Sequence, residues 1–508
     1  MKVSEYRREY AKFCEARERE IFRSQIGTAR DPRADSPFLI FADLFSLETI
    51  SDLKIESKNA AMQFESEREG HRVLLAAAQL VHADIASREA RRELERCEGA
   101  AQFTWNGAAT PARTIGMNLI ANEAAPASRR EIALRVFDAL KSCDDSHVER
   151  AKTLQTTARS LGFDNYLAIR SNASRAQADA LSMMANEFLK RTSEVYRAHL
   201  SQWAASDIPF ARLDELTYAD SLFFKRAKHM DAHFRGLDLH AVYEAAIRAF
   251  GIRTDQQPNV HIDTVLESSG EERSICFGIK PPEEVRLVGA ISRQASDVQN
   301  FIGCAGRAQA YAWTSTELVA RHPEFVYTPD RATNYAYYFL FRSLLQDEQW
   351  IGEHFVFAST TNSTAARAFA LLDSHDARRS AARAVALTAA PNDDLSSEGD
   401  AEEYAQLMTE ATNFRYDASV HLIDWSARVD SIDELRARLF AAHLREHLRT
   451  RHGHRWWTVR SARDELIDLW NTGSRYSVEE LAALLTGATA LDVECLVQAN
   501  LEALNDQI

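Results

Sequence analysis

Apolar residues recur at helical spacing along most of this chain, and this periodicity constrains its fold more than any other feature. Only residues 259–289 follow a different pattern. They contain three short, β-branched segments separated by turn residues, which is typical of strands: 259–265, 273–279 and 285–289. Glycine and proline, which interrupt helices, number only 18 and 11 among 508 residues. The sequence therefore predicts a mainly α-helical protein with one small antiparallel sheet.

Acidic residues outnumber basic ones by 74 to 60, and the formal net charge is -14. A general nucleic-acid binder would carry a basic surface, so nucleic acid is not an expected partner. No apolar run approaches the ~20 residues that span a bilayer, and the charged start lacks the apolar stretch of a signal peptide. The six cysteines show no C-x-x-C spacing. We therefore expect a cytoplasmic protein with reduced thiols and no membrane contact.

Four motifs occur in a fixed order along the chain, three in its first half and one near its centre: residues 38–46, 118–123, 161–166 and 276–287. This order resembles the thimet oligopeptidase and oligoendopeptidase family of zinc peptidases, in which the last motif precedes the active-site helix. The resemblance implies a two-lobed, zincin-like helical fold around a cleft. It places an N-terminal lobe in residues 1–205 and a degenerate catalytic-like lobe in residues 206–508.

The residues that bind zinc in that family are missing from the matching helices. The family's His-Glu-x-x-His motif puts two zinc ligands on one helical face, and its Glu activates the metal-bound water. By the resemblance, Gly303 and Arg307 stand at the histidine positions, and Cys304 replaces the Glu. Tyr335 takes the position of the third ligand, or Asn334 if the register differs by one residue. Glycine offers no ligand atom and arginine repels a cation, so we expect no zinc site, no cofactor and no zinc-peptidase activity.

Arg307 is the centre of the predicted ligand site. The resemblance places it opposite Tyr335 across the former zinc position. There a guanidinium could bind a carboxylate or phosphate in bidentate geometry, and the phenol could add a hydrogen bond. Three further residues complete the predicted site: Tyr311, Tyr338 and Asp430. The alternative is that Arg307 forms an internal ion pair with an acid such as Asp430 or Glu434 and fills the site.

Two features of the same helix have competing interpretations. Cys304 could act as a nucleophile, but no histidine lies near it in sequence to serve as a base, so a buried inert thiol is our expectation. Gly303 and Gly306 each cost about 1 kcal/mol relative to alanine inside a helix. They either allow close helix packing or leave space for a ligand in the former metal site, and both interpretations stay open.

A second metal-like motif lies further along the chain. His443, Glu446 and His447 match the H-x-x-E-H arrangement of inverted zincins, whose spacing could hold a metal. The resemblance places this helix in the C-terminal packing region, and basic residues follow it. We expect a solvated helix face here rather than a metal site.

These features predict a function in two alternative forms. The first is a metal-free pseudo-peptidase that retains the cleft and binds a peptide-like or acyl ligand without hydrolysing it. The second is a metal-independent enzyme that acts on a small molecule in a biosynthetic pathway, with Arg307 and Tyr335 orienting the substrate. A third, weaker possibility is a structural protein whose cleft is filled. The resemblance concerns the fold, and function does not follow from fold.

Overall fold

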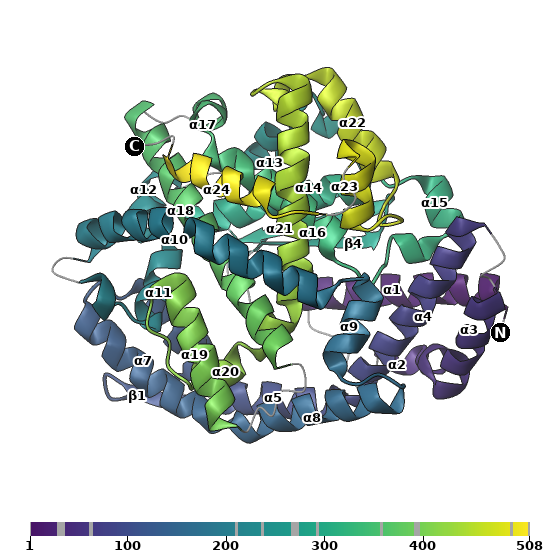
Figure 1. Cartoon of the computed structure of the whole chain (residues 1–508), viewed down its shortest axis with the longest axis horizontal. Coiled ribbons are helices and arrows are strands. Elements are labelled where there is room, and N and C mark those ends of the chain that lie inside the picture. Colours follow the sequence, from purple (N-terminus) through teal and green to yellow (C-terminus); the bar gives the residue numbers. More distant parts are fainter. Residues whose placement is uncertain are drawn as a thin grey trace.

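The computed structural model describes most of the chain: residues 2–27, 36–59, 64–208, 212–234, 238–265, 274–290, 294–355, 359–390, 397–487 and 491–505. It is mainly helical, as the periodicity predicted (Figure 1). The helices before the central sheet are α1 (Val3–Gln25), α2 (Pro37–Ile40), α3 (Leu47–Asn59), α4 (Glu65–Ala86), α5 (Arg88–Ala100), α6 (Met117–Asn122), α7 (Pro126–Lys141), α8 (Asp144–Ser160), α9 (Tyr166–Ser174), α10 (Ala178–Asp207), α11 (Tyr218–Arg226), α12 (Asp231–Phe234) and α13 (Leu239–Arg248). Those after it are α14 (Ala295–Ala312), α15 (Thr316–Arg321), α16 (Ala332–Arg342), α17 (Glu348–His354), α18 (Ser359–Ala389), α19 (Glu398–Thr412), α20 (Val420–Ile423), α21 (Trp425–His452), α22 (Arg460–Asn471), α23 (Val478–Thr486) and α24 (Glu494–Asn505).

The three predicted strands form one sheet in the order β3–β5–β4: β3 (Val260–Val265), β4 (Ser274–Lys280) and β5 (Glu284–Ala290). β4 and β5 are antiparallel, as expected, but β3 pairs with β5 in parallel. The prediction of a wholly antiparallel sheet is therefore wrong for β3. A short turn joins β4 to β5 as a hairpin, and β3 adds to the free side of β5, so β5 becomes the central strand with Val285 and Leu287 fully buried.

A second, two-stranded sheet was not predicted. β1 (Gln102–Trp105) and β2 (Ala108–Pro111) form an antiparallel hairpin. Asn106 and Gly107 close it, and both have positive φ values, 50° and 80°. Asn-Gly is the preferred pair for a two-residue hairpin turn, because both positions need a left-handed backbone. The dipeptide was thus a local signal for this hairpin.

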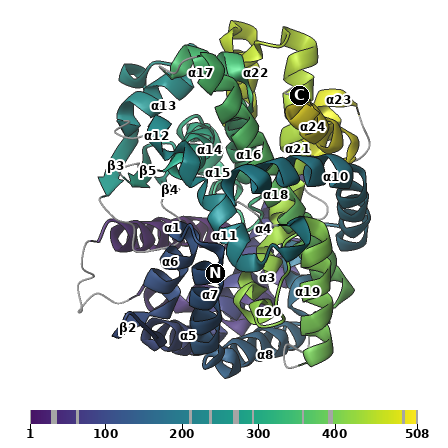
Figure 2. The same cartoon turned by 90° about the vertical axis from the view of Figure 1, so that its left-hand side faces the viewer.

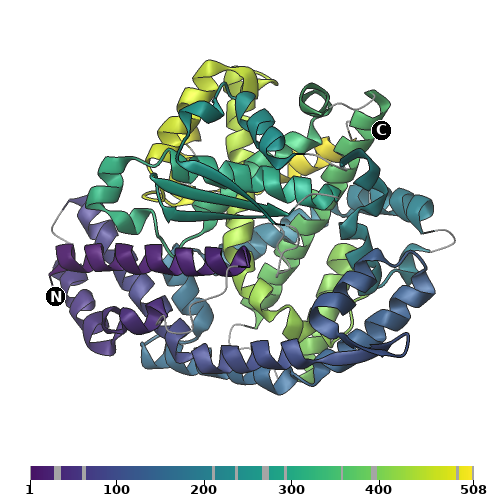
Figure 3. The same ribbon diagram turned by 180° about the vertical axis from the view of Figure 1, so that it is seen from behind.

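Helices cover both faces of the central sheet. α14 packs against β4 and β5, and α1 packs against β4 from the other side. Figures 2 and 3 show α1 running beneath the strands. At this contact the rings of Phe22 and Phe277 meet edge to face, 5.8 Å apart between centroids. The sheet therefore lies between the N-terminal helix and the helix that the resemblance matches to an active-site helix.

The largest hydrophobic core crosses the predicted boundary between the lobes at residue 205. It combines buried residues of α10 with those of the sheet and of the helices that follow, up to Leu504. A second core unites α1, α4 and α9. Among the described helices, none combines the length and hydropathy that a membrane span requires.

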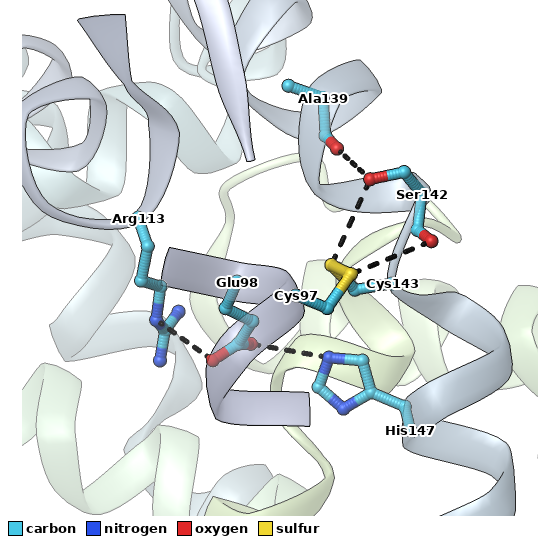
Figure 4. Close-up of a disulfide and its surroundings, with 7 residues drawn as sticks. All are labelled: Cys97, Glu98, Arg113, Ala139, Ser142, Cys143 and His147. Carbon is cyan, nitrogen blue, oxygen red and sulfur yellow. Dashed lines mark hydrogen bonds and ion pairs between the residues drawn. A yellow bond between two sulfur atoms is a disulfide. The ribbon is translucent and has the colours of Figure 1, made fainter. Parts of the chain in front are cut away.

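Cys97 and Cys143 form a disulfide that joins the end of α5 to the start of α8 (Figure 4). The prediction of six reduced thiols is therefore wrong for this pair. The two residues are 46 positions apart, and the packing of α5 against α8 brings them together. An ion pair runs beside the bond, with 3.3 Å between His147 Nε2 and a carboxylate oxygen of Glu98. No spacing rule in the sequence marks this pair.

Candidate functional site

A cavity of about 470 Å³ lies between the N-terminal helices and the helices around the central sheet. α1, α4, α8 and α9 contribute one part of its wall, and β4, α14, α16 and α21 contribute another. Its volume falls in the range of ~300–1,000 Å³ that small-molecule sites occupy. The lining is mixed: charged side chains such as Arg17, Arg170 and Arg331 alternate with aromatic ones such as Phe13, Tyr166 and Trp425.

Four of the five predicted ligand-binding residues line this cavity. Arg307 and Tyr311 lie on α14, Tyr335 lies on α16, and Asp430 lies on α21. These helices are separated in sequence by up to about a hundred residues, and the packing of α16 against both α14 and α21 brings them together. Arg307 and Tyr335 are in direct contact, since the guanidinium carbon lies 4.7 Å from the centre of the Tyr335 ring.

The fifth residue, Tyr338, does not line the cavity. Its ring fills the space beside Gly303, where an added Cβ would lie only 2.4 Å from the ring. Its hydroxyl donates to Asn300 Oδ1 at 2.9 Å and accepts a hydrogen bond from Arg342 at 3.2 Å. Tyr338 therefore serves the packing of α14 against α16 and is withdrawn from the predicted site.

The guanidinium group of Arg307 is oriented by uncharged neighbours. Its Nε donates to Asn334 Oδ1 at 2.6 Å, and its stacking on Tyr335 adds a cation–π contact. Burial lowers the pKa of Arg307, but Tyr335, Tyr311, Cys276 and Cys304 together outweigh this effect and raise it well above the ordinary value. The group is thus a fixed positive charge whose orientation is set before any ligand binds.

The alternative of an internal ion pair is wrong. Asp430 accepts a hydrogen bond from Arg331 and lies 3.6 Å from Arg170. Glu434 pairs instead with an arginine on its own helix, at 3.1 Å. In the part of the chain that the structure describes, no carboxylate forms an ion pair with Arg307. Asp430 therefore acts on the cavity wall mainly by holding Arg331 in place.

Glu18 on α1 is a cavity residue that sequence reasoning missed. Burial raises the pKa of its carboxyl group, although the charges of Arg17 and Arg307 oppose the shift. A carboxyl group of raised pKa in a cavity holds its proton more readily than an exposed one and can exchange it with a ligand. Glu18 lies almost 290 positions before Arg307, and no local motif points to it.

The glycines of α14 are explained by close packing. A Cβ added at Gly306 would lie 2.3 Å from the backbone oxygen of Tyr337, and Gly303 lies equally close to Tyr338. These two positions therefore bring α14 and α16 together and leave no space for a ligand. Cys304 is buried and donates its S–H to Ser274 O at 3.3 Å. It does not line the cavity, which agrees with an inert thiol and argues against a role as a nucleophile.

The H-x-x-E-H residues do not converge on one point. His447 Nε2 lies 2.7 Å from a carboxylate oxygen of Glu465, whereas Glu446 is exposed and accepts a hydrogen bond from Thr450. His443 is buried, with 5% of its surface exposed, and faces the segment before α24. The prediction of a solvated helix face is therefore wrong for His443, and the motif does not form the metal site of an inverted zincin.

The sequence matches no protein-family model and no curated protein. The resemblance to the thimet oligopeptidase family therefore rests on the quoted motifs alone and stays a prediction.

Proposed function

We propose that this protein binds an anionic ligand of peptide-like or acyl character in the cavity around Arg307, and that it is not a zinc peptidase at this position. One observation carries the proposal. Arg307 lines a cavity of ligand size, is oriented by Asn334 and Tyr335, and has no carboxylate partner in the described part of the chain. The guanidinium carries five N–H groups, more than its bonds to Asn334 and Tyr311 use, so N–H groups remain for a carboxylate of the ligand.

One part of the lining suits an apolar group of the ligand. Rings of Phe13, Tyr166 and Trp425 provide surface for acyl or aromatic groups, as is usual in small-molecule sites. Arg150 also lines the cavity and donates to Ser426 Oγ at 3.0 Å. A ligand that carries a carboxylate on a partly apolar chain, such as an acylated amino acid or short peptide, combines these requirements.

The proposal is tested by calorimetric titration with N-acetylated peptides of matched sequence, bearing either a free or an amidated C-terminus. The free carboxylate should bind more tightly to the wild type. Arg307→Ala should weaken binding of the free acid by roughly 10- to 100-fold, because a charge-assisted hydrogen bond contributes about 1.5–3 kcal/mol. The amidated peptides should lose little.

Arg460→Ala is the control, because the side chain of Arg460 is 85% exposed and lies outside the cavity lining. It should bind both peptide series as the wild type does. The ligand class is wrong if the wild type does not distinguish free from amidated peptides, or if Arg307→Ala leaves the distinction intact. Stoichiometric zinc at residues 303–307, with cleavage of a fluorogenic peptide mixture, would contradict the loss of peptidase chemistry.

The second form of the proposal, a metal-independent enzyme acting on a small molecule, is favoured by Glu18. Its raised pKa and its place beside Arg307 are the features expected of an acid–base group near an anion-binding residue. In this reading Arg307 and Tyr335 orient the substrate and Glu18 transfers a proton. Glu18→Gln should then abolish any mass change in bound peptides on incubation while their affinity stays within a few-fold. Unchanged conversion would exclude this role.

We further propose that the protein works in an oxidising compartment and not in the cytoplasm that the sequence predicted. The support is the Cys97–Cys143 disulfide, since such bonds persist in secreted and periplasmic surroundings and are rare where thiols are kept reduced. Alkylation of the protein immediately on cell lysis, followed by intact-mass measurement, distinguishes the two locations. Free thiols at both positions in the native host would contradict this proposal.

A further inference from the structure

We propose that His443, Asp492 and Cys495 bind a zinc-like divalent cation that joins the start of α24 to α21. One possible ligand atom from each residue (imidazole nitrogen, carboxylate oxygen and thiol sulfur) lies within 4.8 Å of the other two. None of the three residues lines the cavity around Arg307. The site is thus separate from the proposed ligand site, and it departs from the expectation that the chain binds no metal.

The spacing of these atoms is close to that of a tetrahedral site. Zinc binds nitrogen, oxygen and sulfur at ~2.0–2.3 Å, so neighbouring ligand atoms in a tetrahedral site are about 3.3–3.8 Å apart. His443 Nε2 and Asp492 Oδ1 are 3.4 Å apart. All three ligand atoms lie within 4.8 Å of one another, so any separation exceeds this range by at most about 1 Å.

Local structure brings the three residues together where α24 begins. Asp492 lies in the segment just before α24, and Cys495 lies in the first turn of that helix. Asp492 Oδ1 also accepts the N–H of Glu494 at 2.8 Å, which orients its carboxylate. His443 belongs to the buried side of α21, and α21 packs against α24.

The Nε2 atom of His443 contacts three atoms of Asp492: the backbone oxygen at 3.3 Å, and the backbone nitrogen and carboxylate Oδ1 at 3.4 Å. All three distances exceed the usual range of ~2.7–3.2 Å for hydrogen bonds. A cation can replace such long contacts, because neutral histidine commonly binds metals through an imidazole nitrogen.

The surrounding charge favours a cation. The carboxylates of Asp492, Glu446 and Glu494 place negative charge around the Cys495 sulfur. A divalent ion bound there would offset this negative charge. A mixed set of nitrogen, sulfur and oxygen ligands suits zinc and similar transition metals, whereas Mg²⁺ and Ca²⁺ prefer oxygen alone. Three protein ligands leave a fourth position for water.

The test is titration of the chelator-treated protein with Co²⁺ under non-reducing conditions, so that the Cys97–Cys143 disulfide contributes no thiol. We expect one Co²⁺ per chain, a near-ultraviolet absorption band from thiolate bound to cobalt, and loss of the band on addition of Zn²⁺. Cys495→Ser should remove the band, and Asp492→Asn should weaken binding. His447→Gln is the matched control and should change neither, since His447 bonds to Glu465 instead.

Cys495 and Asp492 are preferable to His443 as test positions, because Asp492 has a 59% exposed side chain and Cys495 is only partly buried. Circular dichroism should confirm that both variants fold. Absence of stoichiometric Co²⁺ binding would overturn the proposal. So would a cobalt band that persists in Cys495→Ser, or one that His447→Gln removes. A rise in melting temperature with Zn²⁺ that disappears in Asp492→Asn would support it independently.

Discussion

Replacing Gly306 with alanine should destabilise the packing of α14 against α16, although alanine is the better helix former. The added Cβ would lie 2.3 Å from the backbone oxygen of Tyr337 and 2.8 Å from the ring of Phe341. Ordinary van der Waals contact begins near 3.4 Å, so the two helices would have to separate by about 1 Å. The closest atom belongs to the backbone, and no side-chain rotation can relieve the contact.

The expected loss of stability follows from two opposing terms. Overpacking a buried position costs about 1–3 kcal/mol, whereas alanine gains about 1 kcal/mol over glycine inside a helix. The net loss should therefore reach up to about 2 kcal/mol, which lowers the melting temperature of a large chain by a few degrees at most. Unfolding of so large a chain need not be two-state, so hydrogen exchange measured along α14 and α16 should accompany the thermal melt.

Gly99→Ala is the matched control. Gly99 also lies within a helix, α5, but an added Cβ there meets nothing within 4 Å. This variant should gain about 0.5–1 kcal/mol and shift the melting temperature upwards. The two substitutions are chemically identical, so only their surroundings distinguish them. If Gly306→Ala stabilises the protein as Gly99→Ala does, the close-packing argument is refuted and the space beside α14 is open after all.

Three further predictions concern stability. Asp220→Asn should cost about 3–5 kcal/mol, because it leaves the fully buried guanidinium of Arg129 without its counter-charge at 2.5 Å; an unchanged urea midpoint would refute this. Burial and the charge of Arg428 lower the pKa of His421 to about 3. Because the unfolded chain binds this proton more readily, the contribution of neutral His421 to the free energy of unfolding is complete above pH 6.5 and is lost as the pH falls toward 3. His421→Gln should flatten that acid limb in melts recorded against pH, and an unaltered limb would contradict the reasoning. Cys97→Ser opens a loop of 46 residues and should cost about 4 kcal/mol, measured by denaturation without reductant; no loss of stability would contradict the bond's role.

Local features of the fold could be predicted, but the pairing between elements could not. Helical periodicity and the change of period at residues 259–289 depend on neighbours within one segment, and both predictions are confirmed. The parallel pairing of β3 with β5 depends on which strand edge is free after β4 and β5 have paired. The sequence of any one of these strands does not contain this information. The β1–β2 hairpin could have been found from Asn106-Gly107.

The candidate site shows the same division. The family resemblance placed Arg307 and Tyr335 on neighbouring helices, and the structure brings the two side chains together. Glu18 escaped prediction because it reaches the cavity from the opposite end of the chain. Tyr338 shares a helix with Tyr335, but its ring packs into the space beside Gly303 of α14 and not into the cavity.

The amino-acid sequence by itself determined where helices and strands form, because periodicity and turn chemistry act over a few residues. It also determined that residues 303–307 carry no pair of histidines. Only the tertiary structure decided which charges remain available. Arg307 could have paired with Asp430, but the carboxylate of Asp430 instead contacts Arg331 and Arg170. Likewise the fold pairs Cys97 with Cys143, and it places the imidazole of His443 next to Asp492 and away from the other residues of its H-x-x-E-H motif. Hydrogen bonds, ion pairs and disulfides act over a few ångströms. Their partners are therefore fixed only when packing brings segments that are distant in sequence together.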